Sequence, residues 1–173
     1  MFNRKSFFSL TGRAATARQE RSIIKRSSGF SLLEMLVVVM IIVSLATIGI
    51  PQFVRYKIQA QSAKTVTDLQ TLNTSVQLYV IQHGALPDSL GQVLNGNIAD
   101  PWGNPYQYLK IEGNPNANQQ ARKDLFLIVV NSDFDLYSMG PDGQTIIPLA
   151  ASVSQDDAIR ANDGGYFGIA SNY

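Results

Sequence analysis

Hydrophobic residues are concentrated in one uninterrupted run near the start of this chain. The run covers residues 30–50, and Glu34 is its only charged residue. About 20 apolar residues, each rising 1.5 Å, are enough to span a hydrocarbon core of roughly 30 Å. The pattern therefore predicts a transmembrane helix over residues 30–51, with Pro51 at its far end.

An amphipathic pattern follows this run over residues 52–83, which contain no proline and no glycine. Apolar residues return there at short steps: Ile58, Ala63, Val66, Leu69, Leu72, Val76 and Tyr79. This stripe predicts a second helical half that packs on a globular part. Gly84 and Pro87 indicate where the helix ends. Because Pro51 removes an intrahelical hydrogen bond, we expect a kink or a local break there.

The remaining residues, 84–173, have the pattern of a small globular β head. Three segments predict its strands: 106–109, 125–130 and 134–138. The second is continuously apolar, which indicates burial on both faces, and the third alternates, which places Asp135 on a wet face. Residues 114–123 are polar and irregular, as in a hairpin loop. The predicted fold class is α+β, in which a long N-terminal helix packs on a small antiparallel sheet.

Two segments of the head leave alternatives open. Residues 100–108 (DPWGNPYQY) predict tight turns that bring Trp102, Tyr106 and Tyr108 into the core, and a ligand-binding aromatic box is the alternative. Residues 161–173 are rich in glycine with scattered aromatics. They fold back onto the head or contact another copy of the chain.

Charge is divided unevenly between the two sides of the apolar run. Residues 1–29 hold seven Lys and Arg against one acid, whereas residues 30–173 hold seven against twelve. A basic flank stays in the cytoplasm, so the head should lie across the membrane. A secretory signal peptide has a shorter apolar core and a small-residue cleavage site, which residues 46–48 match poorly. An organelle transit peptide is a further alternative for the leader.

Composition also excludes several kinds of site. The chain has no cysteine, so it can form neither a disulfide nor a thiolate metal site. Its acidic remainder gives no footprint for direct binding of nucleic acid. The sequence has no nucleophile elbow, no H-E-x-x-H motif and no P-loop, and His83 is its only histidine. These observations predict that the protein is not an enzyme.

Glu34 is the unusual residue of the apolar run, because an acid inside a membrane helix is costly. One interpretation places it close enough to the cytoplasmic interface to stay hydrated. The other requires a cation. If the chain were cut between Gly29 and Phe30, the new amine of Phe30 would lie one turn before Glu34. It could then pair within its own helix or with Glu34 of a neighbouring copy.

The start of the run resembles the processing site of type IV pilins and pseudopilins. The residues that carry the resemblance are Lys25, Arg26, Gly29, Phe30, Glu34 and Pro51. The resemblance implies that a prepilin peptidase cuts after Gly29, removes the basic leader 1–29 and methylates Phe30. It also implies that Phe30, Glu34 and Pro51 act in assembly.

The head resembles the major pseudopilin of type II secretion systems. Residues 100–108, residues 134–143 and the pair Asp156 and Asp157 carry this resemblance. It implies a calcium site made of the following residues: Asp142, Asp156 and Asp157, with carbonyls from Ser138 and Met139. Carboxylates and carbonyls are suitable Ca²⁺ ligands, although the EF-hand pattern is absent. Solvated turn acids are the alternative.

Together these resemblances imply a structural subunit of a type II secretion pseudopilus, anchored in a bacterial inner membrane with its head in the periplasm. The implied partners are further copies of the chain, prepilin peptidase, the inner-membrane assembly platform with its ATPase, minor pseudopilins and a secretin. A type IV pilus subunit for adhesion, motility or DNA uptake is the alternative. A membrane-anchored enzyme or binding domain is a third possibility, which no motif supports.

Overall fold

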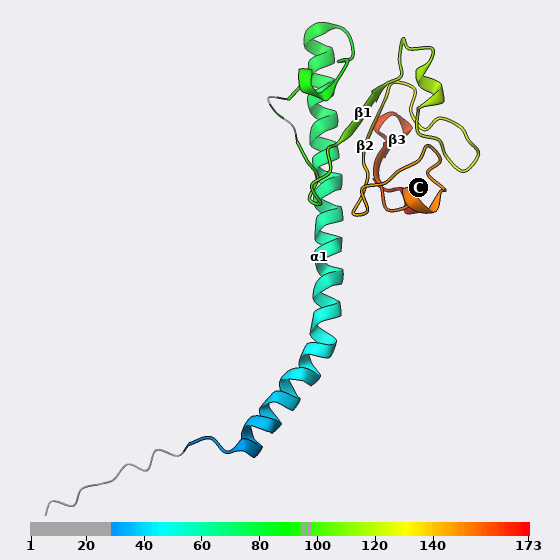
Figure 1. Cartoon of the computed structure of the whole chain (residues 1–173). Coiled ribbons are helices and arrows are strands. Elements are labelled where there is room, and N and C mark those ends of the chain that lie inside the picture. The colour runs from blue at the N-terminus through cyan, green and yellow to red at the C-terminus, as the bar shows by residue number, and fades with distance from the viewer. Residues whose placement is uncertain (1–28, 95, 97) are drawn as a thin grey trace, which may run out of the picture. The chain divides into compact units, whose positions relative to one another are not determined.

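The computed structural model describes residues 29–94, 96 and 98–173, so the predictions for the leader before Gly29 lie outside the described residues. Figure 1 shows one long helix beside a small sheet. The helix is α1 (Leu32–His83), and the strands are β1 (Gln107–Lys110), β2 (Phe134–Ser138), β3 (Ala158–Ala161) and β4 (Tyr166–Ile169). By its internal contacts the chain divides into two units, Met1–Val43 and Ser44–Tyr173, and each is described by itself.

In the first unit, α1 begins immediately after Ser31. The Ser31 hydroxyl accepts a hydrogen bond from the backbone N–H of Leu33 at 3.3 Å, and its carbonyl accepts one from Met35 at 3.1 Å. The side chain thus satisfies an N–H that the first helical turn leaves without a partner. The apolar side chains that follow are exposed, Leu32 among them. In the part of the chain that the structure describes, α1 alone is long and apolar enough to cross a membrane.

In the second unit, α1 continues to His83 and presents one buried face to the head. The buried residues of that face are Thr65, Leu69, Leu72 and Val76. The predicted stripe is therefore confirmed at its centre, whereas Ile58 remains exposed. Pro51 lies inside the helix, so the predicted local break does not occur. The helix ends where Gly84, at φ +73°, donates its N–H to the Val80 carbonyl.

The four strands form one antiparallel sheet in the order β1-β2-β3-β4. Its main core cluster joins the helix face to the sheet: Leu69, Leu72, Val76, Tyr106, Phe134, Leu136 and Ala158. Because this head is small, the helix supplies one wall of its core. The predicted α+β class is confirmed. Tyr106 and Tyr108 pack in this cluster, as the core interpretation of residues 100–108 predicts, whereas Trp102 is only half-buried and is not part of it.

The segment between β1 and β2 is where the strand prediction is wrong. Residues 125–128 form an exposed turn, in which Leu125 is 72 % and Phe126 78 % exposed. The Asp124 carboxylate accepts hydrogen bonds from the N–H groups of Phe126 and Ile128, at 2.8 and 2.9 Å. These bonds hold the backbone in a turn, with Leu127 at φ +61°. Residues 114–123 do lie in the connection between the antiparallel strands β1 and β2, as the hairpin-loop prediction requires, and they include a 3₁₀ turn, Ala117–Gln119.

The end of the chain adds the two strands that the sequence pattern did not predict. β3 pairs with both β2 and β4, so residues 161–173 fold back onto the head. Asp135 does not lie on a wet face. It is buried, and its carboxylate accepts hydrogen bonds from the Arg122 backbone N–H at 2.6 Å and from Asn131 at 2.8 Å. Burial raises the pKa of Asp135.

Candidate functional site

The predicted processing and assembly residues lie at the start of α1. Gly29 and Phe30 precede the helix and are exposed, and Glu34 is in its first turn. A carboxylate in a first helical turn is favoured by the positive end of the helix dipole. No other charged residue occurs between Phe30 and Val54. The acid is therefore placed one turn after the bond that the sequence predicts to be cut.

Of the predicted calcium ligands, Asp142 and Asp156 lie close together. Both line one cavity of about 480 Å³ beside Ser62 of α1. Burial, and then the nearby Asp142 carboxylate, raise the pKa of Asp156. The Asp142 side chain accepts a hydrogen bond from the Gln144 backbone N–H at 2.8 Å, which fixes its own turn.

Asp157 does not join this pair of acids, because its carboxylate is held by Arg122 and Thr145. Its carboxylate oxygen Oδ2 accepts hydrogen bonds from Arg122 Nη2 and from the Thr145 hydroxyl, both at 2.5 Å. Both members of the ion pair are almost fully buried. Burial raises the pKa of Asp157 to about 6, against the opposing effects of Thr145 and Arg122. The carboxyl is therefore mainly ionised at neutral pH.

The predicted calcium ligands at Ser138 and Met139 are their carbonyls, whereas the Ser138 hydroxyl ties β2 to the turn at Asp100. It donates to the Asp100 carboxylate at 2.6 Å, and Asp100 in turn accepts from the N–H groups of Trp102 and Asn104. Among the described residues, no three or more His, Cys, Asp or Glu side chains form a group that could hold a metal ion. The predicted calcium set is thus divided between the pair Asp142 and Asp156 and the ion pair of Asp157.

Gly140 fixes the distance between the two loops that carry these acids. Its φ is +65°, and a Cβ there would lie 2.7 Å from the Asp156 carbonyl oxygen. Only glycine meets both conditions without strain. We expect Gly140→Ala to lower the free energy of unfolding of the head by about 2 kcal/mol or more. Thermal unfolding of the purified protein measures this.

Gly113→Ala is the matched control for that change. Gly113 has φ +74° but nothing within 4 Å of an added Cβ. It reports the cost of the backbone conformation alone, about 1 kcal/mol. Equal losses in the two variants would contradict a steric role for the Asp156 carbonyl.

Sequence reasoning missed the two buried arginines of the head. Arg122 is 3 % and Arg160 1 % exposed. Arginine is rarely buried unless it is paired, and the partners of Arg122 lie 23 to 35 residues further along the chain. No periodicity marks such a residue within an irregular polar segment. Only the spatial arrangement of the loops identifies it.

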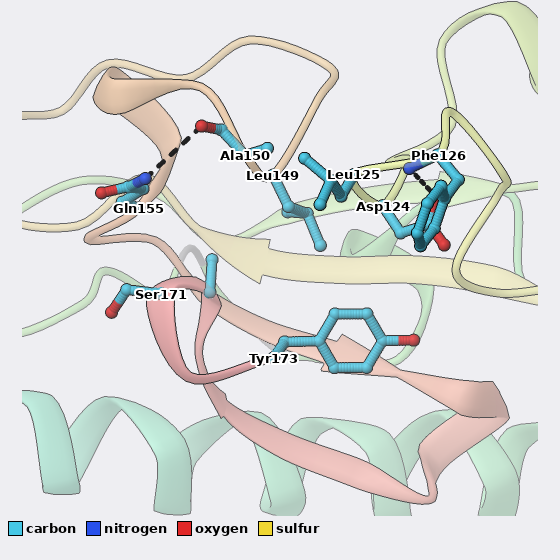
Figure 2. A pocket seen from close by; sticks show the side chains of 9 residues that line it. Asp124, Leu125, Phe126, Leu149, Ala150, Gln155, Ser171 and Tyr173 are labelled. Carbon is cyan, nitrogen blue, oxygen red and sulfur yellow. Dashed lines mark hydrogen bonds between the residues drawn. The ribbon is translucent and has the colours of Figure 1, made fainter.

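A surface pocket of about 550 Å³ lies between the 125–128 turn and the end of the chain. Figure 2 shows Leu125 and Leu149 on one side of it and the Tyr173 ring on the other. The exposed turn is tightly hydrogen bonded, so its apolar side chains are held outward. It is a feature of the head surface.

Comparison with known proteins identifies a motif at the start of the chain and relatives that match about two thirds of it. The prokaryotic N-terminal methylation motif matches residues 24–50, which include Gly29, Phe30 and Glu34. Type II secretion system core protein G of Pseudomonas aeruginosa is 29% identical over 141 residues, covering 69% of this chain and 87% of the relative. The same protein of Vibrio cholerae is 26% identical over 141 residues, covering 70% and 85%.

A shorter match is to a pilin. The type IV major pilin protein PilA of Myxococcus xanthus is 30% identical over 83 residues, covering 48% of this chain and 36% of the relative. No solved structure matches the chain.

Proposed function

Because the chain is a pilin-like protein whose distant homologues are type II secretion core proteins G, we propose that it is a structural subunit of a type II secretion pseudopilus. Many copies polymerise through their N-terminal helices into a filament that drives protein export. These relatives are structural components, in agreement with the prediction that the chain is not an enzyme. The proposed membrane is a bacterial inner membrane, with the head on the periplasmic side.

The observation that carries this proposal is the exposed apolar half of α1. Large side chains such as Leu32, Leu45 and Phe53 are at least two-thirds exposed in the single chain. A contiguous apolar surface of this kind requires a partner in a soluble or a membrane setting. Lipid covers it before assembly, and the helices of neighbouring copies cover it in the filament. The main core of the head is already buried against the second half of α1.

Glu34 supplies the register of the filament. We propose that cleavage after Gly29 creates an ammonium group at Phe30, and that this group pairs with Glu34 of a neighbouring subunit. A buried charge without a partner is costly in hydrocarbon, so the pair fixes how far one helix is shifted along the next. Processing requires a prepilin peptidase, and assembly requires an inner-membrane platform with its ATPase, minor pseudopilins and a secretin.

A type IV pilus subunit is the second candidate function. The similarity to the Myxococcus pilin favours it, since that match extends beyond the methylation motif to 83 residues. The core proteins G match a larger share of the chain and of their own length, which favours the pseudopilus. Export of proteins and surface pili are separate phenotypes, so a deletion strain distinguishes the two.

Mass spectrometry of the protein extracted from membranes tests the processing step. We expect a mature N-terminus at Phe30 that carries one methyl group. Gly29→Leu should leave the leader attached, because the peptidase must accommodate the residue before the cut. Gly49 lies within α1 and has open space around it, so Gly49→Ala is the control and should be processed normally. An intact leader in the wild-type protein would contradict the proposal.

A further inference from the structure

Arg122 gathers oxygen atoms from three separate residues at the centre of the head. Its Nη1 donates to the Thr145 hydroxyl at 2.5 Å and to the Ile146 carbonyl at 2.6 Å, and its Nη2 donates to the Asp157 carboxylate. A carboxylate, a carbonyl and a hydroxyl are oxygen donors of the kind that surround a hard cation such as Ca²⁺. Here the group that these three oxygen atoms surround is the guanidinium of Arg122.

The same group ties a long loop to the sheet. Thr145 also donates to Asp157, and the Ser154 hydroxyl accepts from the Ile146 N–H at 2.9 Å, so both ends of the 145–157 loop meet at Arg122. The guanidinium carbon lies 4.6 Å from the centre of the Tyr137 ring on β2. The Arg122 backbone N–H is bonded to Asp135 of the same strand. The loop, β2 and the residue before β3 are thus joined through one residue, Arg122.

We propose that Arg122 is a built-in cation that replaces a metal ion at Asp157, so that the head closes its 145–157 loop without calcium. The guanidinium supplies a fixed positive charge and directed N–H donors at Asp157, one of the predicted calcium ligands. This inference concerns the head alone. It holds for a pseudopilus and for a pilus.

The arrangement of Asp157 opposes a second cation. Its Oδ2 is already used by Arg122 and Thr145. In the part of the chain that the structure describes, two buried side-chain atoms lack a partner, Asp157 Oδ1 and Arg122 Nε, and both belong to this ion pair. One is an acceptor and the other a donor, so a small rotation within the pair would satisfy both. A divalent ion at Oδ1 would instead lie beside a like charge.

The test is thermal unfolding of the full chain in detergent, followed by the fluorescence of Trp102, the only tryptophan. We expect the same melting temperature in millimolar Ca²⁺ and in chelator, because a ligand that bound the folded head would raise it. Arg122→Met should lower the melting temperature by roughly 10 °C in both solutions, since it leaves a buried carboxylate unpaired. Lys64→Met, which removes an exposed ion pair with Asp68, is the control and should have little effect.

Two further variants keep the test decisive if Arg122→Met does not fold. Arg122→Lys keeps the charge but loses the fork, and Asp157→Asn keeps the shape but loses the charge. Each should lower the melting temperature equally with and without calcium. A rise of several degrees when Ca²⁺ is added to the wild-type protein would overturn the proposal. So would an unchanged melting temperature in Arg122→Met, since the guanidinium would then not hold the loop closed.

Discussion

Replacing Glu34 by leucine is expected to reduce the amount of assembled filament by about a hundredfold. In the variant, the ammonium group of Phe30 has no carboxylate to pair with among the packed helices. Removing one member of a buried ion pair costs about 3–5 kcal/mol, and each 1.4 kcal/mol is a factor of ten in an equilibrium constant. Sheared filament is measured by immunoblotting. Export of proteins across the outer membrane should fall with it.

Matched variants distinguish the loss of this ion pair from a failure of membrane insertion or of processing. Glu34→Leu must still be inserted and cut at Phe30, which the mass of the extracted protein establishes. Glu34→Gln keeps the size of the side chain and should lose assembly too, because it lacks the charge. Glu34→Asp should recover part of it. Normal filament yield in both Leu and Gln variants would support the other interpretation, in which Glu34 stays hydrated at the cytoplasmic interface.

The helix could be predicted from the sequence because its causes are local. An uninterrupted apolar run leads to a helix in hydrocarbon, where backbone groups must bond within their own segment. The stripe at Leu69, Leu72 and Val76 repeats with the helical period, and Gly84 provides the left-handed residue that ends it. The motif at Gly29, Phe30 and Glu34 is short and continuous. It needs no knowledge of the fold to be identified.

The head was harder to predict because its strands are short and depend on distant partners. Residues 125–130 look like a buried strand, yet the Asp124 carboxylate organises them into a turn. β3 contains a buried arginine, so its pattern does not indicate a strand. The acids of the predicted calcium site lie in loops, and the site itself stays a prediction. Their separation by Arg122 depends on contacts between residues far apart in the sequence.

Arg160→Met is expected to lower the melting temperature of the head by about 15 °C or more. Arg160 has no exposed side-chain surface and joins α1 to the sheet. Its Nε donates to Asn73 of α1 at 2.8 Å, its Nη1 to the Phe134 carbonyl at 2.9 Å, and its fork to both oxygens of Asp133, at 2.8 and 2.6 Å. Removing one member of a buried ion pair costs about 3–5 kcal/mol, a large part of the stability of a small domain.

Circular dichroism and Trp102 fluorescence during heating measure this loss. Lys110→Met removes a partly exposed ion pair with Asp88 and serves as the control, with an expected change of no more than about 1 kcal/mol. Arg160→Lys keeps the charge but cannot bond Asp133, Asn73 and Phe134 together, so it should recover only a minor part of the loss. If Arg160→Lys were as stable as the wild type, the charge alone would suffice. The geometry argues against that result, because the N–H groups of one planar fork reach the helix, the loop and the strand at the same time.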